Sequence, residues 1–180
     1  MRTRLHLLCA FLIAVTSGVA AQPVATETIE KSFDKTRTSL KLERFREDLG
    51  SVPGETRRLE YLYYLDSKDQ LVKIRMIESE DRPDTSIKVD DYFFINGDLR
   101  LVRLYFFIDS SRLELLRKGL IVPLLTGEHI ELRDGKLVRW NALAREIPST
   151  DRRWADKQSS VLFSARVEIN NYAEFKKPKQ

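Results

Sequence analysis

Cysteine and histidine are nearly missing from this chain of 180 residues, which contains one cysteine and two histidines. Cys9 and His6 both lie in the first 21 residues. Without that segment the chain has no disulfide, no thiol nucleophile and no cysteine-based metal site. Its one remaining histidine is His129, so the thiol and all but one imidazole are missing among the groups used in acid–base and nucleophilic catalysis. The sequence therefore predicts a non-enzymatic protein without catalytic, cofactor-binding or metal-binding residues.

The first 21 residues have the three parts of a cleavable signal peptide in the right order. Arg2 and Arg4 come first, an apolar run follows over residues 5–15, and small residues stand at positions 19–21. The apolar run is too short to cross a hydrocarbon core, which takes about 20 residues. An uncleaved membrane helix is therefore the weaker interpretation. The sequence predicts an exported protein that starts near Gln22, is periplasmic or secreted, and keeps no stable membrane anchor.

The charge of the exported part is nearly balanced. Removing Arg2 and Arg4 leaves 29 Lys and Arg against 27 Asp and Glu, a net charge of +2 in place of +4. Nucleic-acid binding depends on a basic face, so nucleic acid is not expected as a partner. Residues 22–175 are long enough for one domain with its own core. The basic, proline-broken segment 176–180 is expected to be disordered.

The segment before residue 41 has helical spacing. Ile29, Phe33 and Leu40 are separated by four and seven residues, which places them on one helical face. A helix is therefore predicted from residue 26 to about Leu40. Its second half contains threonine and serine, which are weak helix formers, so an alternating strand that begins with Leu40 and Leu42 is the other interpretation.

The middle of the chain changes to a period of two, which is typical of strands. Apolar runs recur in pairs around short turn signals, which predicts three hairpins. Asn96-Gly97 and Asp134-Gly135 stand in the second and third turns, where a type I′ turn needs positive φ at both residues. The sequence thus predicts an antiparallel meander of about six strands. These strands are residues 58–65 and 71–77, 87–95 and 99–108, and 128–132 and 137–140.

Two further helical segments complete the predicted fold. A short helix fits residues 110–118, and a C-terminal helix fits about residues 150–174. The C-terminal segment carries an apolar stripe that is expected to pack on the sheet. The prediction is one α+β domain with a helix at each end of the meander and a short helical insertion. The stripe consists of Trp154, Val161, Ala165 and Ile169, at offsets of seven, four and four.

The hairpin sequences also support a family comparison. Residues 92–99 read YFFINGDL and residues 134–140 read DGKLVRW. They resemble the repeated YYF-x-NG-x-L and DG-K-L-x-R-W hairpins of small exported bacterial proteins of uncharacterised function, which are built as a helix followed by a β-meander. The resemblance covers about residues 29–140 and implies a compartment and an architecture. It carries over no catalytic or binding residue.

His129 and several acidic residues are the candidates for chemistry. In a strand His129 shares its face with Glu131 while Glu128 points away, but no Gly-x-Ser-x-Gly elbow accompanies this possible base. Asp90 and Asp91 are adjacent, so a strand directs them to opposite faces. The acids at positions 78, 80, 81 and 84 fit a solvated loop better than a carboxylate pair or a calcium loop. A carboxylate-dependent hydrolase is therefore the least favoured hypothesis.

Aromatic residues gather in three strand segments, residues 61–64, 92–94 and 105–107. Consecutive aromatics cover both faces of a strand, so either two helices cover both faces of the sheet or one face stays open for a partner. Basic residues of the return strands would form the rim of an open face: Lys73, Arg75, Arg100 and Arg103. The candidate binding face comprises Tyr61, Tyr63, Tyr64, Phe94, Tyr105, Phe107, Arg75 and Arg103.

The preferred functional hypothesis is a module that binds another protein of the cell envelope, because aromatic surfaces are common in protein interfaces. The alternative is a carrier that holds a lipid or another apolar small molecule between the sheet and the C-terminal helix.

Overall fold

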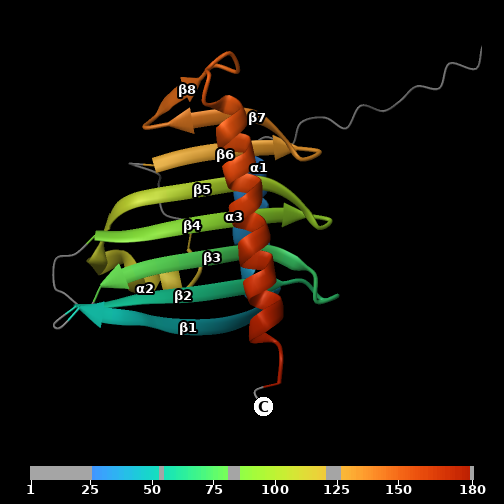
Figure 1. Cartoon of the computed structure of the whole chain (residues 1–180). Helices are drawn as coiled ribbons and strands as arrows, with labels where there is room; N and C mark the ends of the chain where they lie inside the picture. The colour runs from blue at the N-terminus through green and yellow to red at the C-terminus, as the bar shows by residue number, and fades with distance from the viewer. Residues whose placement is uncertain (1–25, 53–54, 81–85, 121–126, 179–180) are drawn as a thin grey trace, which may run out of the picture.

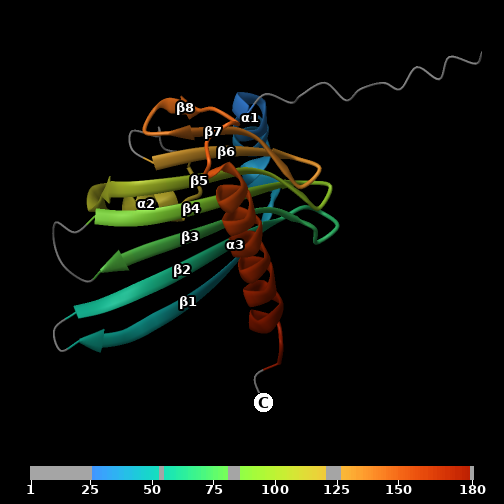
Figure 2. The same cartoon turned by 45° about the horizontal axis from the view of Figure 1, so that its top comes forward.

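The computed structural model describes residues 26–52, 55–80, 86–120 and 127–178. The strands of this part form one antiparallel sheet of eight strands. Every strand pairs with the next one along the chain, in the order β1-β2-β3-β4-β5-β6-β7-β8. One long helix lies in front of the sheet (α3) and a shorter one behind it (α1), as Figures 1 and 2 show. The predicted α+β meander is confirmed, with more strands than the six expected.

The bounds of the elements follow the predicted order closely. The strands are β1 (Lys41–Val52), β2 (Glu55–Leu65), β3 (Leu71–Glu80), β4 (Ser86–Ile95), β5 (Asp98–Asp109), β6 (Gly127–Arg133), β7 (Lys136–Ala142) and β8 (Arg145–Ile147). The helices are α1 (Thr26–Thr36), α2 (Leu113–Arg117) and α3 (Trp154–Phe175), with the 3-10 turns η1 (Arg37–Ser39) and η2 (Ser110–Arg112). The expected signal peptide and the acids Asp81 and Asp84 lie outside the described residues.

The three predicted hairpins are present. They are β2–β3, β4–β5 and β6–β7, and each pair is antiparallel. Asn96 and Gly97 have φ values of 53° and 85°, and Asp134 and Gly135 have φ values of 51° and 71°. These left-handed values are the ones that a type I′ turn requires. The two dipeptides are therefore explained by the turns in which they stand.

The two strands that the hairpin pattern leaves out lie at the edges of the sheet. Leu40 is extended, with φ −81° and ψ 142°, and leads into β1, so the strand interpretation is correct here and the helix ends at Thr36. Threonine and serine weaken the helix after that residue. At the other edge, Leu143 and Ala144 connect β7 to β8 with φ values of 49° and 61°. Leucine and alanine seldom adopt such left-handed φ values. The sequence therefore carries no turn signal for the last hairpin.

Helix α3 crosses the strands steeply (Figure 1) and is anchored near both ends. Near its start, Lys157 forms an ion pair of 2.7 Å with Glu128 of β6. Near its end, Tyr172 donates a hydrogen bond of 2.9 Å to Glu43 of β1, and Lys176 binds the same carboxylate at 2.9 Å. Lys176 belongs to the segment expected to be disordered, yet it is tied to the sheet. Residues 179–180 of that segment lie outside the described part.

The predicted apolar stripe of α3 is correct in its first part and wrong in its last residue. Val161 and Ala165 are 5 % and 4 % exposed, whereas Ile169 is 38 % exposed and Glu168 is buried in its place. A helix has 3.6 residues per turn, so repeated steps of four drift off the buried face and a step of three brings the stripe back. The stripe thus continues from Ala165 to Glu168.

Each face of the sheet has its own apolar layer. Under α1 this layer contains Ile29 and Phe33 of the helix together with strand residues such as Leu62, Ile77 and Phe93. Under α3, a row of buried side chains runs across the middle strands from partner to partner. This row consists of Tyr63, Ile74, Tyr92, Val102, Ile130 and Trp140.

Candidate functional site

The residues of the predicted binding face do not share one surface. Strand alternation separates them onto opposite faces of the sheet, and a terminal helix covers each face (Figure 1). The prediction of a single exposed aromatic face is therefore wrong. Tyr61, Tyr63 and Phe94 are buried in the layer under α3. Tyr64, Arg75, Arg103 and Tyr105 are buried on the side of α1, and the side chain of Phe107 lies outside the described part.

The basic residues expected at the rim of that face have different environments. Arg100 is half-buried and donates a hydrogen bond of 3.2 Å to the Leu132 carbonyl. Lys73, Arg75 and Arg103 are buried. Lys73, Arg75 and the core residue Ile77 are two residues apart, and side chains at this spacing lie on one face of a strand. This spacing was the signal in the sequence for their burial.

Asp91 of β4 is the centre of a buried charged cluster between the sheet and α1. Arg75 of β3 donates two hydrogen bonds to its carboxylate, from Nε and from Nη2, each of 2.6 Å. The ammonium of Lys73 lies 2.8 Å from the same carboxylate, and the side chains of all three residues are fully buried. The Arg75 Nη1 atom donates to the carbonyls of Leu116 and Leu120, both at 2.9 Å. The guanidinium of Arg75 is thus held on both sides.

A second ion pair joins the same cluster to α1. Arg103 of β5 stands opposite Asp91 in the register of the two strands, and it forms a hydrogen-bonded ion pair with Glu30 of the helix. The Arg103 guanidinium also lies over the Tyr105 ring, 4.7 Å from its centroid. The Lys73 ammonium lies 4.6 Å and 4.4 Å from the ring centroids of Phe33 and Phe93. We call Glu30, Lys73, Arg75, Asp91 and Arg103 the charged cluster.

Burial and neighbouring charges shift the pKa values of the charged cluster. Burial, and then the Arg75 charge, lowers the pKa of Lys73 to about 7. Burial opposes ionisation of Asp91, but Arg75 and Lys73 outweigh it and hold the Asp91 pKa at about 2. Burial raises the pKa of Glu30, although Arg103 works in the other direction. At neutral pH the cluster therefore contains more cationic than anionic groups, and Lys73 is close to its titration midpoint.

The Tyr64 and Tyr105 hydroxyls lie on the same side of the sheet. Each is buried without a hydrogen-bond partner among the described residues. The Tyr64 hydroxyl lies against Gly119, where an added Cβ would be 2.3 Å from the hydroxyl oxygen. Gly119 also has a φ of 80°, so glycine is required there for two reasons. Burial raises the pKa of both tyrosines, and their protons therefore remain available for donation.

His129 does not form the base that its position beside Glu131 suggested. Burial, with the charges of Arg103 and Arg139, lowers the pKa of His129 to about 4. Glu131 forms an ion pair of 3.1 Å with Arg139. Glu128 faces α3, where it pairs with Lys157. The structure thus places these three residues as alternation predicted, and it binds both glutamates to cations.

Two acidic residues are buried on the α3 face of the sheet, Asp90 and Glu168. Asp90 and Asp91 lie on opposite faces, as expected, and Asp90 points to the side of α3. Burial raises the Asp90 pKa to about 6. Burial also raises the pKa of Glu168 on α3, and the Asp90 charge adds to that shift. In the described ranges, no three His, Cys, Asp or Glu side chains are grouped so that they could hold a metal ion.

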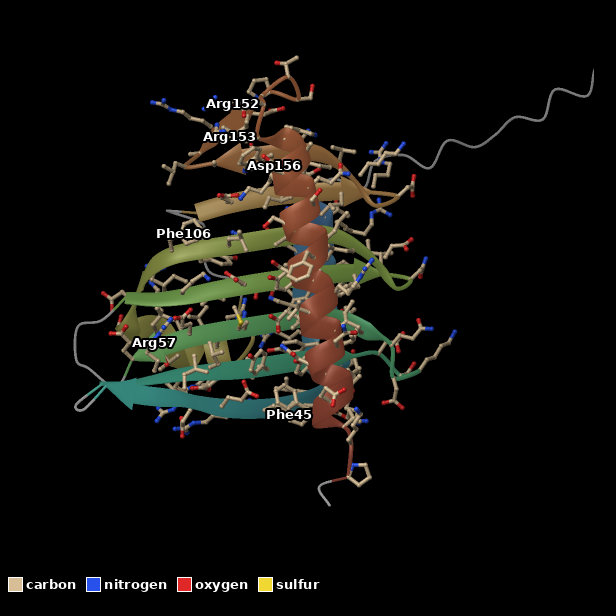
Figure 3. All side chains as sticks on the ribbon, viewed as in Figure 1. Phe45, Arg57, Phe106, Arg152, Arg153 and Asp156 are labelled. Atoms are coloured by element: carbon tan, nitrogen blue, oxygen red, sulfur yellow. The ribbon has the colours of Figure 1, made fainter. Side chains whose placement is uncertain are left out.

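Beside α3, one band of the sheet stays partly open. In Figure 3, Arg57 and Phe106 lie on the part of the sheet that the helix leaves uncovered. Half-buried apolar side chains of β2, β3 and β5 line this band: Leu59, Met76, Leu104 and Phe106. Charged residues lie between them: Arg57 pairs with Glu78, and Lys88 lies 3.7 Å from Asp90. We call these eight residues the open band.

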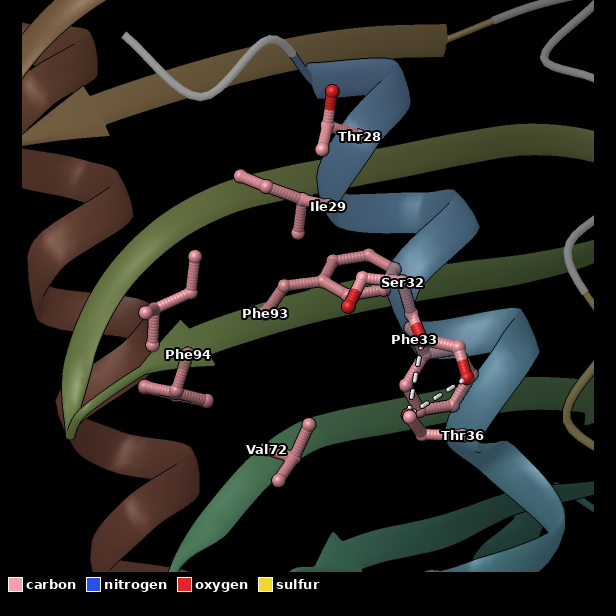
Figure 4. A pocket seen from close by; sticks show the side chains of 9 residues that line it. Thr28, Ile29, Ser32, Phe33, Thr36, Val72, Phe93 and Phe94 are labelled. Atoms are coloured by element: carbon pink, nitrogen blue, oxygen red, sulfur yellow. Dashed lines mark hydrogen bonds between the residues drawn. The ribbon is translucent and has the colours of Figure 1, made fainter. Parts of the chain in front are cut away.

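A small pocket lies at the other side of the sheet, between α1 and the β3 and β4 strands (Figure 4). Its volume is about 160 Å³. Phe33 and Phe93, whose rings contact the Lys73 ammonium, form part of its wall, and Thr28, Ser32 and Thr36 provide hydroxyl groups. The remaining lining is apolar: Ile29, Val72, Phe94 and Ile95.

Comparisons with known proteins leave the geometry as the source of functional inference. No protein-family model matches the chain, and no curated protein or solved structure matches it. The resemblance to small exported bacterial proteins stays a prediction. None of the helices formed by the described residues is long and apolar enough to span a membrane.

Proposed function

We propose that this protein is an exported, non-enzymatic module that binds another protein of the cell envelope through the open band. The observation that carries the proposal is the composition of this band. Half-buried apolar side chains of β2, β3 and β5 alternate with charged side chains on this band, and Asp90 lies between Met76 and Leu104 in the strand register. Interfaces between separately folded proteins combine apolar and polar surface in this way.

The position of α3 supports this proposal. The helix is tied to β6 by Lys157 and to β1 by Tyr172, so the edge of the open band is fixed before a partner arrives. A preformed surface loses less conformational entropy on binding than a mobile one. The signal-peptide pattern of residues 1–21 supports the envelope as the compartment of the partner.

The test is site-specific photo-crosslinking in living cells. A photoreactive benzoylphenylalanine replaces Lys88, which is exposed within the open band. In the control it replaces Lys136, which is exposed at the start of β7. We expect a discrete adduct with one envelope protein at position 88 that is absent at position 136. The adduct should be lost when Phe106→Asp is added, because an aspartate replaces an aromatic side chain of the interface with a charge.

The proposal is wrong if position 88 gives no adduct, or if both positions give the same products. Circular dichroism of the Phe106→Asp protein must show an unchanged spectrum, so that loss of the adduct reports binding and not unfolding.

A carrier of apolar molecules is the second candidate function, and the pocket under α1 is the observation that favours it. A volume of about 160 Å³ is close to that of an engineered apolar cavity that binds benzene. It suits a small ligand or one end of a longer chain. Native mass spectrometry of protein purified from its own host separates the two functions, because a carrier should arrive with a bound ligand and a protein-binding module should not.

A further inference from the structure

We propose that the protein that binds the open band inserts an arginine side chain, which pairs with the Asp90 carboxylate. This inference rests on the proposed function and names the chemistry of the partner at one position of the interface. It also explains why a buried carboxylate lies between two apolar side chains of this band.

The surroundings of Asp90 leave its carboxylate poorly compensated. Asp90 is 6 % exposed. Its cross-strand neighbours are Met76 and Leu104, whose side chains carry no hydrogen-bond donor. The Asp90 Oδ1 atom is buried and has no hydrogen-bond partner among the described residues. A buried carboxylate without donors lowers the stability of a fold, and proteins keep such residues mostly at functional sites.

Lys88 lies beside Asp90 but holds the carboxylate loosely. Its ammonium is 3.7 Å from the Asp90 Oδ2 atom, which is longer than a hydrogen bond, and its side chain is 44 % exposed. An exposed ion pair of this kind contributes little to stability. The Lys88 side chain can therefore turn into solvent and leave its place beside Oδ2 to a cation of the partner.

The other charged residues on this face of the sheet favour a cation over an anion as the incoming group. Arg57 is paired with Glu78 of the neighbouring strand, and Glu168 of α3 is a second buried acid. Arginine suits the position better than lysine, because its planar guanidinium binds a carboxylate through two hydrogen bonds. It is also more weakly hydrated than an ammonium, so it loses less on entering a half-buried apolar band.

Photo-crosslinking from position 88 tests the proposal when it is combined with Asp90→Asn. This substitution keeps the shape of the side chain and removes its charge. The yield of the adduct should fall at least about tenfold, because loss of one member of a desolvated charge pair weakens binding strongly. Asp98→Asn is the matched control, since it makes the same chemical change at an exposed residue outside the open band. It should leave the yield unchanged.

The effect on folding should be opposite to the effect on binding. Asp90→Asn removes a poorly compensated buried charge, so the melting temperature of the variant should be no lower than that of the wild type. A loss of the adduct in a protein of equal or higher stability reports the interface and not unfolding.

Mass spectrometry of the adduct identifies the segment of the partner that contacts the band. This segment should contain an arginine whose replacement by methionine lowers the adduct yield when Asp90 is present. The same replacement should have no further effect in Asp90→Asn, because the two side chains then form one coupled pair.

The inference is overturned, while the proposed function stands, if position 88 gives its adduct and Asp90→Asn leaves the yield unchanged. It is also overturned if Asp98→Asn lowers the yield equally, or if the contacted segment contains no arginine. If position 88 gives no adduct in the protein with Asp90, the proposed function is wrong and this inference is wrong with it.

Discussion

The charged cluster permits a sharp test of how much a buried carboxylate contributes to this fold. Asp91→Asn keeps the size of the side chain but replaces a charged acceptor with a neutral amide. Asp91 accepts two hydrogen bonds of 2.6 Å from Arg75 and lies 2.8 Å from the Lys73 ammonium. In the variant one amide NH₂ group faces these donors, and the buried Arg75 guanidinium loses its counter-ion.

The magnitude follows from the burial of the three side chains, which are fully buried. Removal of one partner from a buried ion pair costs about 3 to 5 kcal/mol, because the other charge stays buried without compensation. A domain of this size has a total stability of about 5 to 15 kcal/mol. The variant should therefore lose a large fraction of its stability, and its melting temperature should fall by roughly 10 °C.

Urea unfolding followed by circular dichroism measures this loss. Asp98→Asn is the matched control, because Asp98 is exposed at the start of β5 and the same chemical change there should cost less than about 0.5 kcal/mol. Lys73→Met should recover little of the loss when added to Asp91→Asn, because the Lys73 pKa of about 7 falls further without the Asp91 charge and the ammonium loses its proton. A change below about 1 kcal/mol for Asp91→Asn would refute the reasoning, because the buried cations would then not depend on this carboxylate.

Val161→Asp should destabilise the protein by more than about 3 kcal/mol, because it buries a charge under α3. Ile169→Asp should change the melting temperature little, because Ile169 is 38 % exposed. Equal effects of the two variants in thermal melts would contradict the packing of α3. Leu143→Asn combined with Ala144→Gly should stabilise the β7–β8 turn by about 1 kcal/mol, because these residues tolerate the left-handed φ values of the turn; a lower urea midpoint would argue against that geometry. Burial raises the Asp90 pKa from 3.8 to about 6, so its protonation favours the folded state and this contribution is lost as pH rises through 6. Asp90→Asn should therefore raise the free energy of unfolding at pH 7.5 by up to about 3 kcal/mol. It should also weaken the gain in stability that the wild type shows on acidification to pH 5. Equal pH profiles of stability for the two proteins would show that Asp90 does not cause this gain.

The sequence alone determined the elements whose signals are local. Alternating apolar residues and the dipeptides Asn96-Gly97 and Asp134-Gly135 predicted the three central hairpins, because a type I′ turn and a half-buried strand each impose their pattern on neighbouring residues. The same alternation placed Asp90 and Asp91 on opposite faces. The edge strands lacked such signals, since β1 is highly charged and the β7–β8 turn uses Leu143 and Ala144.

Only the tertiary structure decided what covers each face of the sheet. A charged residue on a strand is usually exposed to solvent. Lys73, Arg75 and Arg103 were expected at the rim of an open sheet face for that reason. Their burial depends on Asp91 and Glu30, which lie 16 to 18 and 73 residues away from their partners. A compensating charge at such a distance along the chain leaves no local pattern in the sequence. The sequence therefore identified the strands and turns, while the pairing of distant charges converted an expected exposed surface into a buried site.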